Sequence, residues 1–147
     1  PEPESVQLTL SNPKFADNLY YNSGRYNLVP NAAIDGTWVN HNAYNGFAHS
    51  KTGKNPKFSV DLPENAVVKT VTIYPRNNCC YDRYSKMTVK VGGVTCTPAQ
   101  AFSNSYVKDN IQNGLVWDCN NAFGQNIEVG NQNFIQIAEI VAVGYQL

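Results

Sequence analysis

The stretch VVKTVTIY (67–74) decides the class of fold. Apolar and β-branched residues dominate it, and the pattern is typical of a β-strand, whose side chains alternate between two faces. The alternation places Val67, Lys69, Val71 and Ile73 on one face, and Val68, Thr70, Thr72 and Tyr74 on the other.

Further segments on both sides of this stretch also predict strands. They are 5–10, 57–62, 86–93, 114–119, 125–129 and 134–147. Turn sequences rich in Gly, Asn, Asp and Pro separate them, and the one helical feature expected is a turn near 99–103. Short strands at this spacing predict an all-β fold, either a β-sandwich or a jelly roll. The length fits a single domain covering 1–147.

The composition argues against two classes of partner. Charged residues make up 15% of the chain and the formal net charge is zero, whereas an average domain has about 25% charged residues. Without a basic run, nucleic acid is not an expected partner. Without an apolar run of about 20 residues, no membrane insertion is expected.

The four cysteines, Cys79, Cys80, Cys96 and Cys119, lack the spacing of a zinc site. An even number of cysteines favours disulfides, which form in oxidising compartments. The chain has no N-x-S/T sequon despite its many asparagines, which argues mildly against a glycosylating secretory route. A secreted or extracellular location remains the better interpretation.

Two irregular stretches, 18–56 and 75–85, hold the candidate functional residues, because binding residues concentrate on loops. The first stretch is rich in aromatic and histidine side chains, which suit a shallow binding surface or act as lids on the end of the sandwich. These side chains are Tyr20, Tyr21, Tyr26, Trp38, His41, Tyr44, Phe47 and His49.

The second stretch contains PRNNCCYDR (75–83), in which two adjacent cysteines lie between two arginines. Adjacent Cα atoms are only about 3.8 Å apart, so a bond between Cys79 and Cys80 would close a small strained ring. The alternative is that each of the two pairs with a distant partner, Cys96 or Cys119. The spacing leaves both arrangements open.

Arg76 and Arg83 are two of only three arginines in the chain. A guanidinium group has five N–H donors and no acceptor. Two such groups aimed at one point suit a ligand rich in oxygen acceptors, either an anion or a polyol. The alternative is that each arginine pairs with a nearby acid such as Asp82.

The spacing around this stretch resembles a known signature. His49 precedes Arg76 by 27 positions, and Arg76-Asn77-Asn78 is followed by four residues and then Arg83. This resembles the signature of the F-type lectins, the fucose-binding fucolectins: His, 26 residues, Arg-x-Asp, four residues, then Arg or Lys, with adjacent cysteines in the gap. The resemblance extends from about residue 11 to 147 and includes the segments NAAIDG (31–36), NPKFSVDL (55–62) and AEIVAVG (138–144).

The resemblance implies a discoidin-like β-sandwich jelly roll with the binding loops at one end. It also implies that His49, Arg76 and Arg83 hydrogen-bond L-fucose. The Cys79–Cys80 pair would be bonded and lie against an apolar edge of the sugar, and Cys96 would pair with Cys119. The candidates for a pocket around the methyl group of fucose are Tyr20, Tyr21, Tyr26 and Tyr44.

Because Arg76 and Arg83 supply donors only, the site needs an acceptor, and we expect His49 to be that acceptor. The neutral imidazole has a free ring nitrogen for a sugar hydroxyl, and the imidazolium has none. The ordinary pKa of a histidine is near 6.5, and we expect the two neighbouring arginines to lower the pKa of His49 below this value. Sugar affinity is then expected to fall below roughly pH 6.

The family also carries a structural calcium ion under these loops. By resemblance, its ligands here are the carboxylates of Asp35 and Glu139 together with backbone carbonyls, which form the oxygen shell that calcium prefers. The carbonyls are those of Ala32, Thr37, Gly46 and Ala138. The alternative is that IDG (34–36) is simply a turn.

The sequence departs from the family pattern at several positions. Asn78 stands where the family has Asp, which removes a carboxylate expected to orient the arginines. Lys57 and Phe58 replace tryptophans. Phe47 and Ala138 occupy positions that a disulfide joins in some members, so both halves of that bridge are missing together.

Three functions are weighed. A calcium-containing lectin for terminal L-fucose on glycans is favoured. A discoidin-like adhesion or recognition module that binds protein or lipid, with weak or no sugar binding, is the alternative. An enzyme is not expected, because no catalytic or nucleotide-binding motif is present. The sequence leaves open whether the domain forms an oligomer or belongs to a larger multidomain protein.

Overall fold

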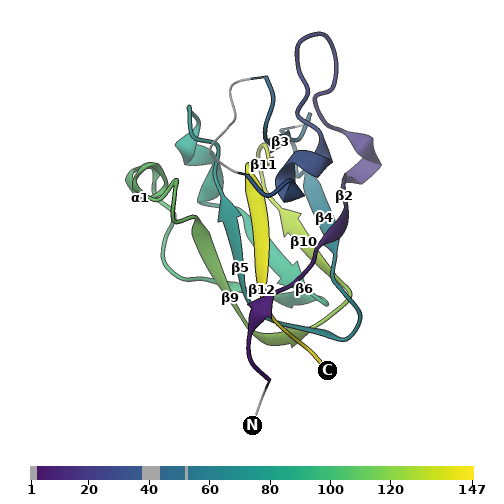
Figure 1. The fold of residues 1–147 in the computed structure, drawn as a ribbon. Helices are drawn as coiled ribbons and strands as arrows, with labels where there is room; N and C mark the ends of the chain where they lie inside the picture. Colours follow the sequence, from purple (N-terminus) through teal and green to yellow (C-terminus); the bar gives the residue numbers. More distant parts are fainter. Residues whose placement is uncertain (1–2, 38–43, 52) are drawn as a thin grey trace.

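A computed structural model of the chain describes residues 3–37, 44–51 and 53–147. Within them the chain forms two five-stranded sheets, one small two-stranded sheet and a few short helices (Figure 1). The pairings between these strands are antiparallel. No helix in the described part of the chain is long and apolar enough to span a membrane.

The first sheet has the order β1-β12-β5-β9-β8. Its strands are β1 (Val6–Gln7), β12 (Glu139–Gln146), β5 (Ala66–Tyr74), β9 (Leu115–Phe123) and β8 (Thr97–Pro98). The second sheet has the order β2-β4-β10-β6-β7. Its strands are β2 (Ser11–Phe15), β4 (Lys57–Asp61), β10 (Asn126–Gly130), β6 (Thr88–Val91) and β7 (Val94–Thr95).

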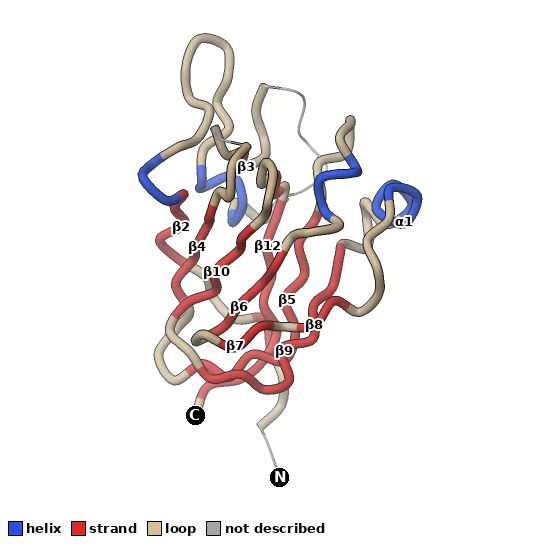
Figure 2. The backbone as a smooth tube through the Cα atoms, turned by 180° about the vertical axis from the view of Figure 1, so that it is seen from behind, coloured by secondary structure: helices blue, strands red, loops and turns tan. Residues whose placement is uncertain are grey.

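The remaining elements lie at or near one end of the sandwich, which we call the loop end (Figure 2). They are the pair β3 (Ala48–His49) and β11 (Gln136–Ile137), the 3-10 helices η1 (Ala16–Asn18), η2 (Pro30–Ile34) and η3 (Tyr81–Tyr84), and the helix α1 (Asn104–Asp109). The C-terminus lies at the opposite end (Figure 1).

The core lies between the two large sheets and confirms the all-β prediction. Val71 and Ile73 of β5 and Trp117 of β9 are fully buried in it, together with Val89 and Val129 of the opposite sheet. Burial of one large apolar side chain contributes about 1.5–3 kcal/mol. The alternation of apolar residues therefore accounts for the sandwich.

The face assignment within β5 is wrong at its beginning. The register between β5 and β9 shifts between Val68 and Thr70. A bulge adds one residue to a strand and reverses the alternation beyond it. Val68 therefore joins Val71 and Ile73 in the core, and Lys69 does not share their buried face.

Several element boundaries also differ from the prediction. The expected strand 5–10 is a strand only at β1, and β2, β7 and β8 were not expected. The expected strand 134–147 is broken at Ala138, which separates β11 from β12. The prediction of a helical turn near 99–103 is wrong, because the helix in this region is α1. This helix begins after Ser103, whose hydroxyl accepts the Tyr106 N–H at 3.3 Å.

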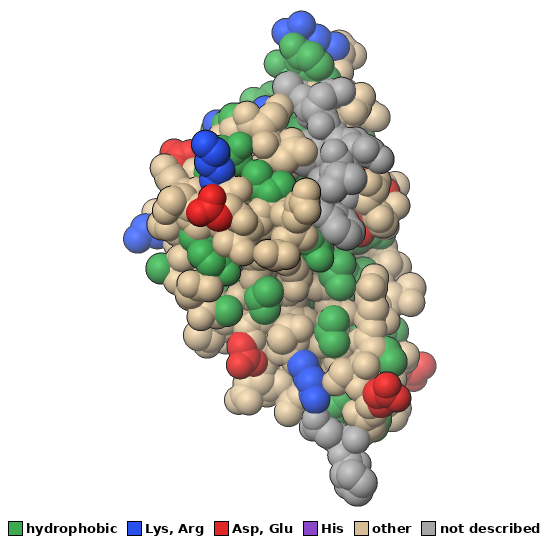
Figure 3. All heavy atoms as spheres, turned by 60° about the vertical axis from the view of Figure 1, so that its left-hand side comes forward, with side chains coloured by type: hydrophobic (Ala, Val, Ile, Leu, Met, Phe, Trp, Pro, Cys, Tyr) green, Lys and Arg blue, Asp and Glu red, His purple; other side chains and the backbone are tan. Residues whose placement is uncertain are grey.

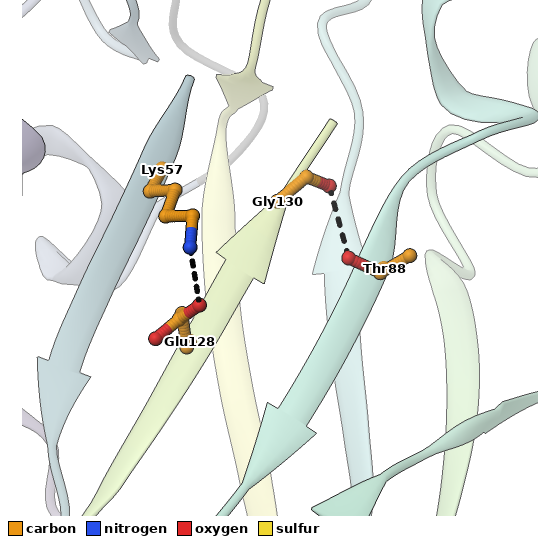
Figure 4. Close-up of polar contacts among 4 residues, drawn as sticks. All are labelled: Lys57, Thr88, Glu128 and Gly130. Atoms are coloured by element: carbon orange, nitrogen blue, oxygen red, sulfur yellow. Dashed lines mark hydrogen bonds and ion pairs between the residues drawn. The ribbon is translucent and has the colours of Figure 1, made fainter. Parts of the chain in front are cut away.

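The two positions where the family has tryptophans are used in different ways. Phe58 is buried against Phe15, with ring centroids 5.1 Å apart. Lys57 points outward, and its Nζ lies 3.4 Å from Glu128 Oε1 on the neighbouring strand (Figure 4). On the other side of β10 the Thr88 hydroxyl donates to the Gly130 carbonyl at 3.5 Å (Figure 4). This face of the second sheet is solvated.

Candidate functional site

An open cleft of about 330 Å³ at the loop end brings together residues from four separate segments. Its volume is near the lower limit for small-ligand sites, about 300–1,000 Å³. The segments are 21–28, 44–49, 76–83 and the turn before β11. The lining residues are Tyr21, Tyr26, Leu28, Tyr44, His49, Arg76, Arg83 and Phe134.

The turn after β5 holds the two arginines at a defined separation. Tyr84 is fully buried; its hydroxyl accepts the Arg76 backbone N–H at 2.9 Å and donates to the Gln136 carbonyl at 2.8 Å. Burial raises the pKa of Tyr84, so the phenol keeps its proton. The Tyr81 hydroxyl donates to the Asn77 carbonyl at 2.9 Å and closes the turn.

The adjacent cysteines form part of this turn. Cys79 is bonded to Cys80, with Cα atoms 3.8 Å apart, and Cys80 has a φ of 68°, a left-handed conformation. Cys80 directly precedes η3, and its carbonyl accepts the Arg83 N–H at 3.2 Å. The bridge thus constrains the backbone between Arg76 and Arg83. Both cysteines are partly exposed, and neither lines the cleft.

The second bridge joins Cys96 to Cys119, which are 23 positions apart. Both residues are buried in the core. The bridge ties the connection between β7 and β8 to β9, and thus links the two large sheets. Such a bridge typically contributes about 3 kcal/mol. The structure therefore contains both disulfides that the family resemblance implied.

His49 is 5% exposed and has defined roles for both ring nitrogens. Its Nδ1 lies 2.6 Å from the Ser50 carbonyl, which can only accept, so Nδ1 carries the proton. Nε2 is then an acceptor in the neutral ring, and Arg83 Nη1 lies 3.4 Å from it.

This environment changes the expected titration of His49. Burial, followed by the charges of Arg83 and Arg76, lowers the pKa of His49 to about 4, although the Ser50 carbonyl acts in the opposite direction. The predicted direction agrees with this shift. The expected loss of affinity below roughly pH 6 does not agree with it, because the sequence does not predict the burial of His49. The pH at which sugar affinity should fall moves to about 4.

Each arginine is held against an aromatic ring. The Arg76 guanidinium carbon lies 4.9 Å from the centre of the Phe47 ring, and that of Arg83 lies 4.6 Å from the Phe134 ring. Burial and the nearby Arg83 lower the pKa of Arg76 from its usual high value. Within the described residues neither arginine forms an ion pair with a carboxylate, so pairing with Asp82 is not what holds Arg83.

Asn78 retains part of the role of the family's aspartate. Its Oδ1 accepts a hydrogen bond from Arg76 Nε. The amide therefore still orients the guanidinium, although it supplies no negative charge. Replacement of the aspartate by Asn78 therefore removes a negative charge but does not remove the group that orients Arg76.

Aromatic rings form one wall of the cleft. The Tyr21 ring lies 5.3 Å from the His49 ring, Tyr26 lies 5.7 Å from Tyr21, and Tyr44 lies 5.4 Å from Tyr26. Tyr20 does not line the cleft; it packs against Phe15 and the core. Trp38 and His41 lie outside the described residues.

Leu28 and Phe134 line the cleft but were not predicted. The sequence pattern predicts Phe134 in a strand covering 134–147, although the residues before it, NQN (131–133), are typical of a turn. Asn131 holds this turn, since its amide donates to the Arg83 carbonyl at 2.6 Å and to the Phe134 carbonyl at 2.9 Å. Leu28 carried no signal that distinguishes it from any core leucine.

Below the cleft, Asp35 and Glu139 come together from distant parts of the chain. The Gly36 N–H donates to both carboxylate oxygens of Glu139, at 3.2 and 3.1 Å. Burial, together with the neighbouring Asp35 carboxyl, raises the pKa of Glu139 to about 8. No basic side chain of the described residues pairs with either acid. A bound cation would offset this repulsion, so the two carboxylates fit a hard metal ion.

The backbone groups named as calcium ligands lie in the same part of the chain. Ala32 belongs to η2, Thr37 follows Gly36, and Ala138 directly precedes Glu139. Gly46 precedes Phe47, which packs with Ala138 and Leu28 in a small apolar cluster. Phe47 and Ala138, the two positions expected to match a disulfide of some family members, thus belong to one apolar cluster. No group of three or more His, Cys, Asp or Glu residues suits a metal in the described part of the chain.

Comparison with known proteins identifies relatives of this fold. The chain is 31% identical to fucolectin-5 from Anguilla japonica over 64 residues, which cover 44% of this chain and 34% of the relative. The F-type lectin from the serum of striped bass (Morone saxatilis) superposes with a TM-score of 0.65 at 18% identity, over 92% of this chain and 47% of that one. A fucose-binding module from Streptococcus pneumoniae superposes with a TM-score of 0.66 at 19% identity, over 92% of both chains.

No protein-family model matches the chain. The resemblance to the F-type lectins is nevertheless confirmed: the chain shares sequence with a fucolectin and has the discoidin-like β-sandwich fold of the F-type lectins and fucose-binding modules. The matched segment spans about a third of the curated relative, and the chain spans about half of the striped bass lectin.

Proposed function

We propose that this chain is a calcium-containing lectin that binds terminal L-fucose on glycans in the cleft at the loop end. The observation that carries the proposal is the convergence of His49, Arg76 and Arg83 on one open cleft, with no carboxylate partner for either arginine among the described residues. Buried polar groups normally find partners. A sugar with several hydroxyl groups supplies them.

The three side chains divide the hydrogen bonds of the sugar between them. The guanidinium groups of Arg76 and Arg83 donate to hydroxyl and ring oxygens, as donor-only groups must. His49 Nε2 accepts the proton of a hydroxyl in place of its 3.4 Å contact with Arg83 Nη1, because its Nδ1 is committed to the Ser50 carbonyl. This set discriminates between sugars because an analogue without a matching hydroxyl leaves a buried group unpaired.

The apolar wall suits the methyl group that distinguishes fucose from sugars with a hydroxymethyl group. Leu28 and Tyr21 lie beside His49 at the wall of the cleft. Tyr26 and Tyr44 extend this wall towards solvent. The Cys79–Cys80 bridge keeps the turn between the two arginines rigid. Because neither cysteine lines the cleft, any contact of the bridge with the sugar is made outside the cleft, at its rim.

Calcium has a structural role in this proposal. The carboxylates of Asp35 and Glu139 and the carbonyls of Ala32, Thr37, Gly46 and Ala138 are its ligands. Glu139 lies opposite Tyr74, the last residue of β5, and Ala138 packs on Phe47, which supports Arg76. The acids thus hold together the segments that position the sugar site.

The chain acts as a single binding domain with fucosylated glycans as partners and without catalysis. Its two disulfides and the serum origin of one structural relative support secretion. An adhesion module that binds protein or lipid is the competing function for this fold. Specific elution of the bound chain by free L-fucose distinguishes the two.

Titration calorimetry with L-fucose tests the proposal directly. We expect millimolar to sub-millimolar binding, which corresponds to about 4–6 kcal/mol for a single monosaccharide. D-Mannose, which lacks the methyl group and differs in hydroxyl geometry, is the negative-control sugar. Failure to bind L-fucose by calcium-loaded, folded protein would refute the function.

A further inference from the structure

All three arginines of the chain lie at the cleft or its rim. Arg76 and Arg83 line the cleft, and Arg25 lies on the adjoining wall. The segment 20–28 protrudes at the top of Figure 1, and Figure 3 shows basic side-chain atoms beside hydrophobic ones at that tip. Arg25 is the one Lys or Arg in that segment. A protein of zero net charge therefore concentrates its guanidinium groups at one site.

Arg25 is positioned by the aromatic wall. Its guanidinium carbon lies 4.4 Å from the centre of the Tyr44 ring and 5.9 Å from the centre of the Tyr26 ring. The backbone below it is fixed, because the Asn27 N–H donates to the Tyr44 carbonyl at 2.7 Å and the Tyr26 N–H to the Ser23 carbonyl at 3.0 Å. A stacked guanidinium leaves its N–H edges directed away from the rings.

Negative charge is scarce around the cleft. The segments 20–28, 44–49, 76–84 and 131–136 contain one acid, Asp82. In the described part of the chain none of the three arginines forms an ion pair. His49 adds no negative charge. Fucose is neutral, so its binding leaves this local excess of positive charge without a counterpart.

We propose that Arg25, Tyr26 and Tyr44 form a second subsite for an anionic group, a carboxylate or a sulfate, carried by the sugar next to the fucose. This inference rests on the proposed function and specifies its ligand as an acidic fucosylated glycan. The Tyr44 ring holds the guanidinium of Arg25, the exposed Tyr26 ring contacts the second sugar, and the Arg25 fork pairs with the anion of that sugar. The cleft takes the fucose, and the exposed rim takes the neighbouring acidic sugar.

The expected effect is moderate because Arg25 is solvent-exposed. Exposed ion pairs change affinity by about two- to fivefold, and salt screens them over about 10 Å at 0.1 M. The preference for an acidic glycan should therefore be largest at low ionic strength.

Affinities for three probes at about 20 mM and about 500 mM salt test the proposal: a neutral fucosylated trisaccharide, its 3-sulfated form and its sialylated form. The measured quantity is the ratio of acidic to neutral affinity. We expect a ratio of about two to five for at least one acidic probe in low salt, shrinking towards one in high salt. The probe that is preferred identifies sulfate or carboxylate as the source of the charge.

Arg25→Gln should bring this ratio to about one. Lys90→Gln, which removes the same charge from an exposed position of strand β6, should leave this ratio unchanged. A ratio of one in the unmodified protein, or a ratio that Arg25→Gln leaves intact, overturns the second subsite while fucose binding stands. Absence of binding to all three probes and to L-fucose instead overturns the proposed function itself.

Discussion

The loop end contains two clusters of like charge, and they differ in sign. Among the described residues, the cleft gathers Arg76 and Arg83 with no paired carboxylate, and the corner below it gathers Asp35 and Glu139 with no paired base. The two clusters are connected, since Ala138 beside Glu139 packs on Phe47, and Phe47 lies under Arg76.

The comparison teaches that the sign and the burial of a charge cluster indicate the ligand that complements it. A pair of acids, one of them buried, fits a compact cation, because a carboxylate in such a place is otherwise driven to bind a proton. Arginines over aromatic rings fit an oxygen-rich ligand, because they keep their charge and offer only donors. In the proposed function the acidic cluster serves stability and the basic cluster serves recognition.

Removal of calcium should give the largest effect and break the acidic half of the comparison. A metal at about 1,000 times its dissociation constant stabilises the native state by about 4 kcal/mol, which corresponds to a fall of about 10 °C in Tm for a domain of this size. Thermal melting in excess chelator measures it. Magnesium is the control, because it prefers a smaller octahedral site. An unchanged melting curve would show that Asp35 and Glu139 hold no metal.

Arg83→Ala should give the next largest effect and break the basic half. Loss of one guanidinium leaves a sugar hydroxyl unpaired, at a cost of about 1–3 kcal/mol, so affinity for L-fucose should fall about 10- to 100-fold. Calorimetry measures this, with Tm as the test of folding and Lys90→Ala as the control. Retained binding by a folded Arg83→Ala protein contradicts the clamp.

Acidification should weaken L-fucose binding through His49. In the proposed site neutral His49 accepts the sugar hydroxyl, and its pKa is lowered to about 4 by burial and by Arg83. Affinity should therefore stay constant from about pH 8 to about pH 5 and fall to half near pH 4. Calorimetric titrations of calcium-loaded protein measure the profile.

The folding state must be checked at each pH of this titration. The unfolded imidazole has a pKa near 6.5, so below that value the unfolded chain binds a proton that the folded chain does not, and stability declines as the pH falls. A binding transition centred near pH 6.5 contradicts the burial of His49. A profile that stays flat to about pH 3 contradicts its role as acceptor.

Asn78→Asp should have the smallest effect and sharpen the comparison. The new carboxylate would accept from Arg76 Nε as the amide does and add one negative charge to the arginine cluster. An exposed pair contributes about 0.2–1 kcal/mol, so L-fucose affinity should change by less than about fivefold. Binding to the neutral sugar, measured beside Asn77→Asp as a control for charge alone, checks this. A loss greater than about tenfold would show that the cleft requires its full positive charge.

Much of the fold could be predicted from the sequence because it depends on local periodicity. The alternation in 57–62, 67–74 and 125–129 corresponds to β4, β5 and β10 within one or two residues. The edge strands could not be predicted in the same way. The strand β2 has the sequence SNPKF, whose Pro and Asn disfavour a strand, and it forms through pairing with β4.

The sequence by itself marked the residues of the proposed site. The two arginines around adjacent cysteines stand out in the sequence alone, and the resemblance of their spacing to the F-type lectin signature adds His49. Asp35 and Glu139 are marked only through the resemblance of their flanking segments.

The tertiary structure alone decided how these residues act. Burial sets the low pKa of His49, contacts with Phe47 and Phe134 hold the guanidinium groups, and the aromatic wall places Arg25 at the rim of the same cleft. Each of these features depends on residues far apart in the chain. Desolvation, ring contacts and the meeting of like charges arise only when the two sheets bring their loops to one end.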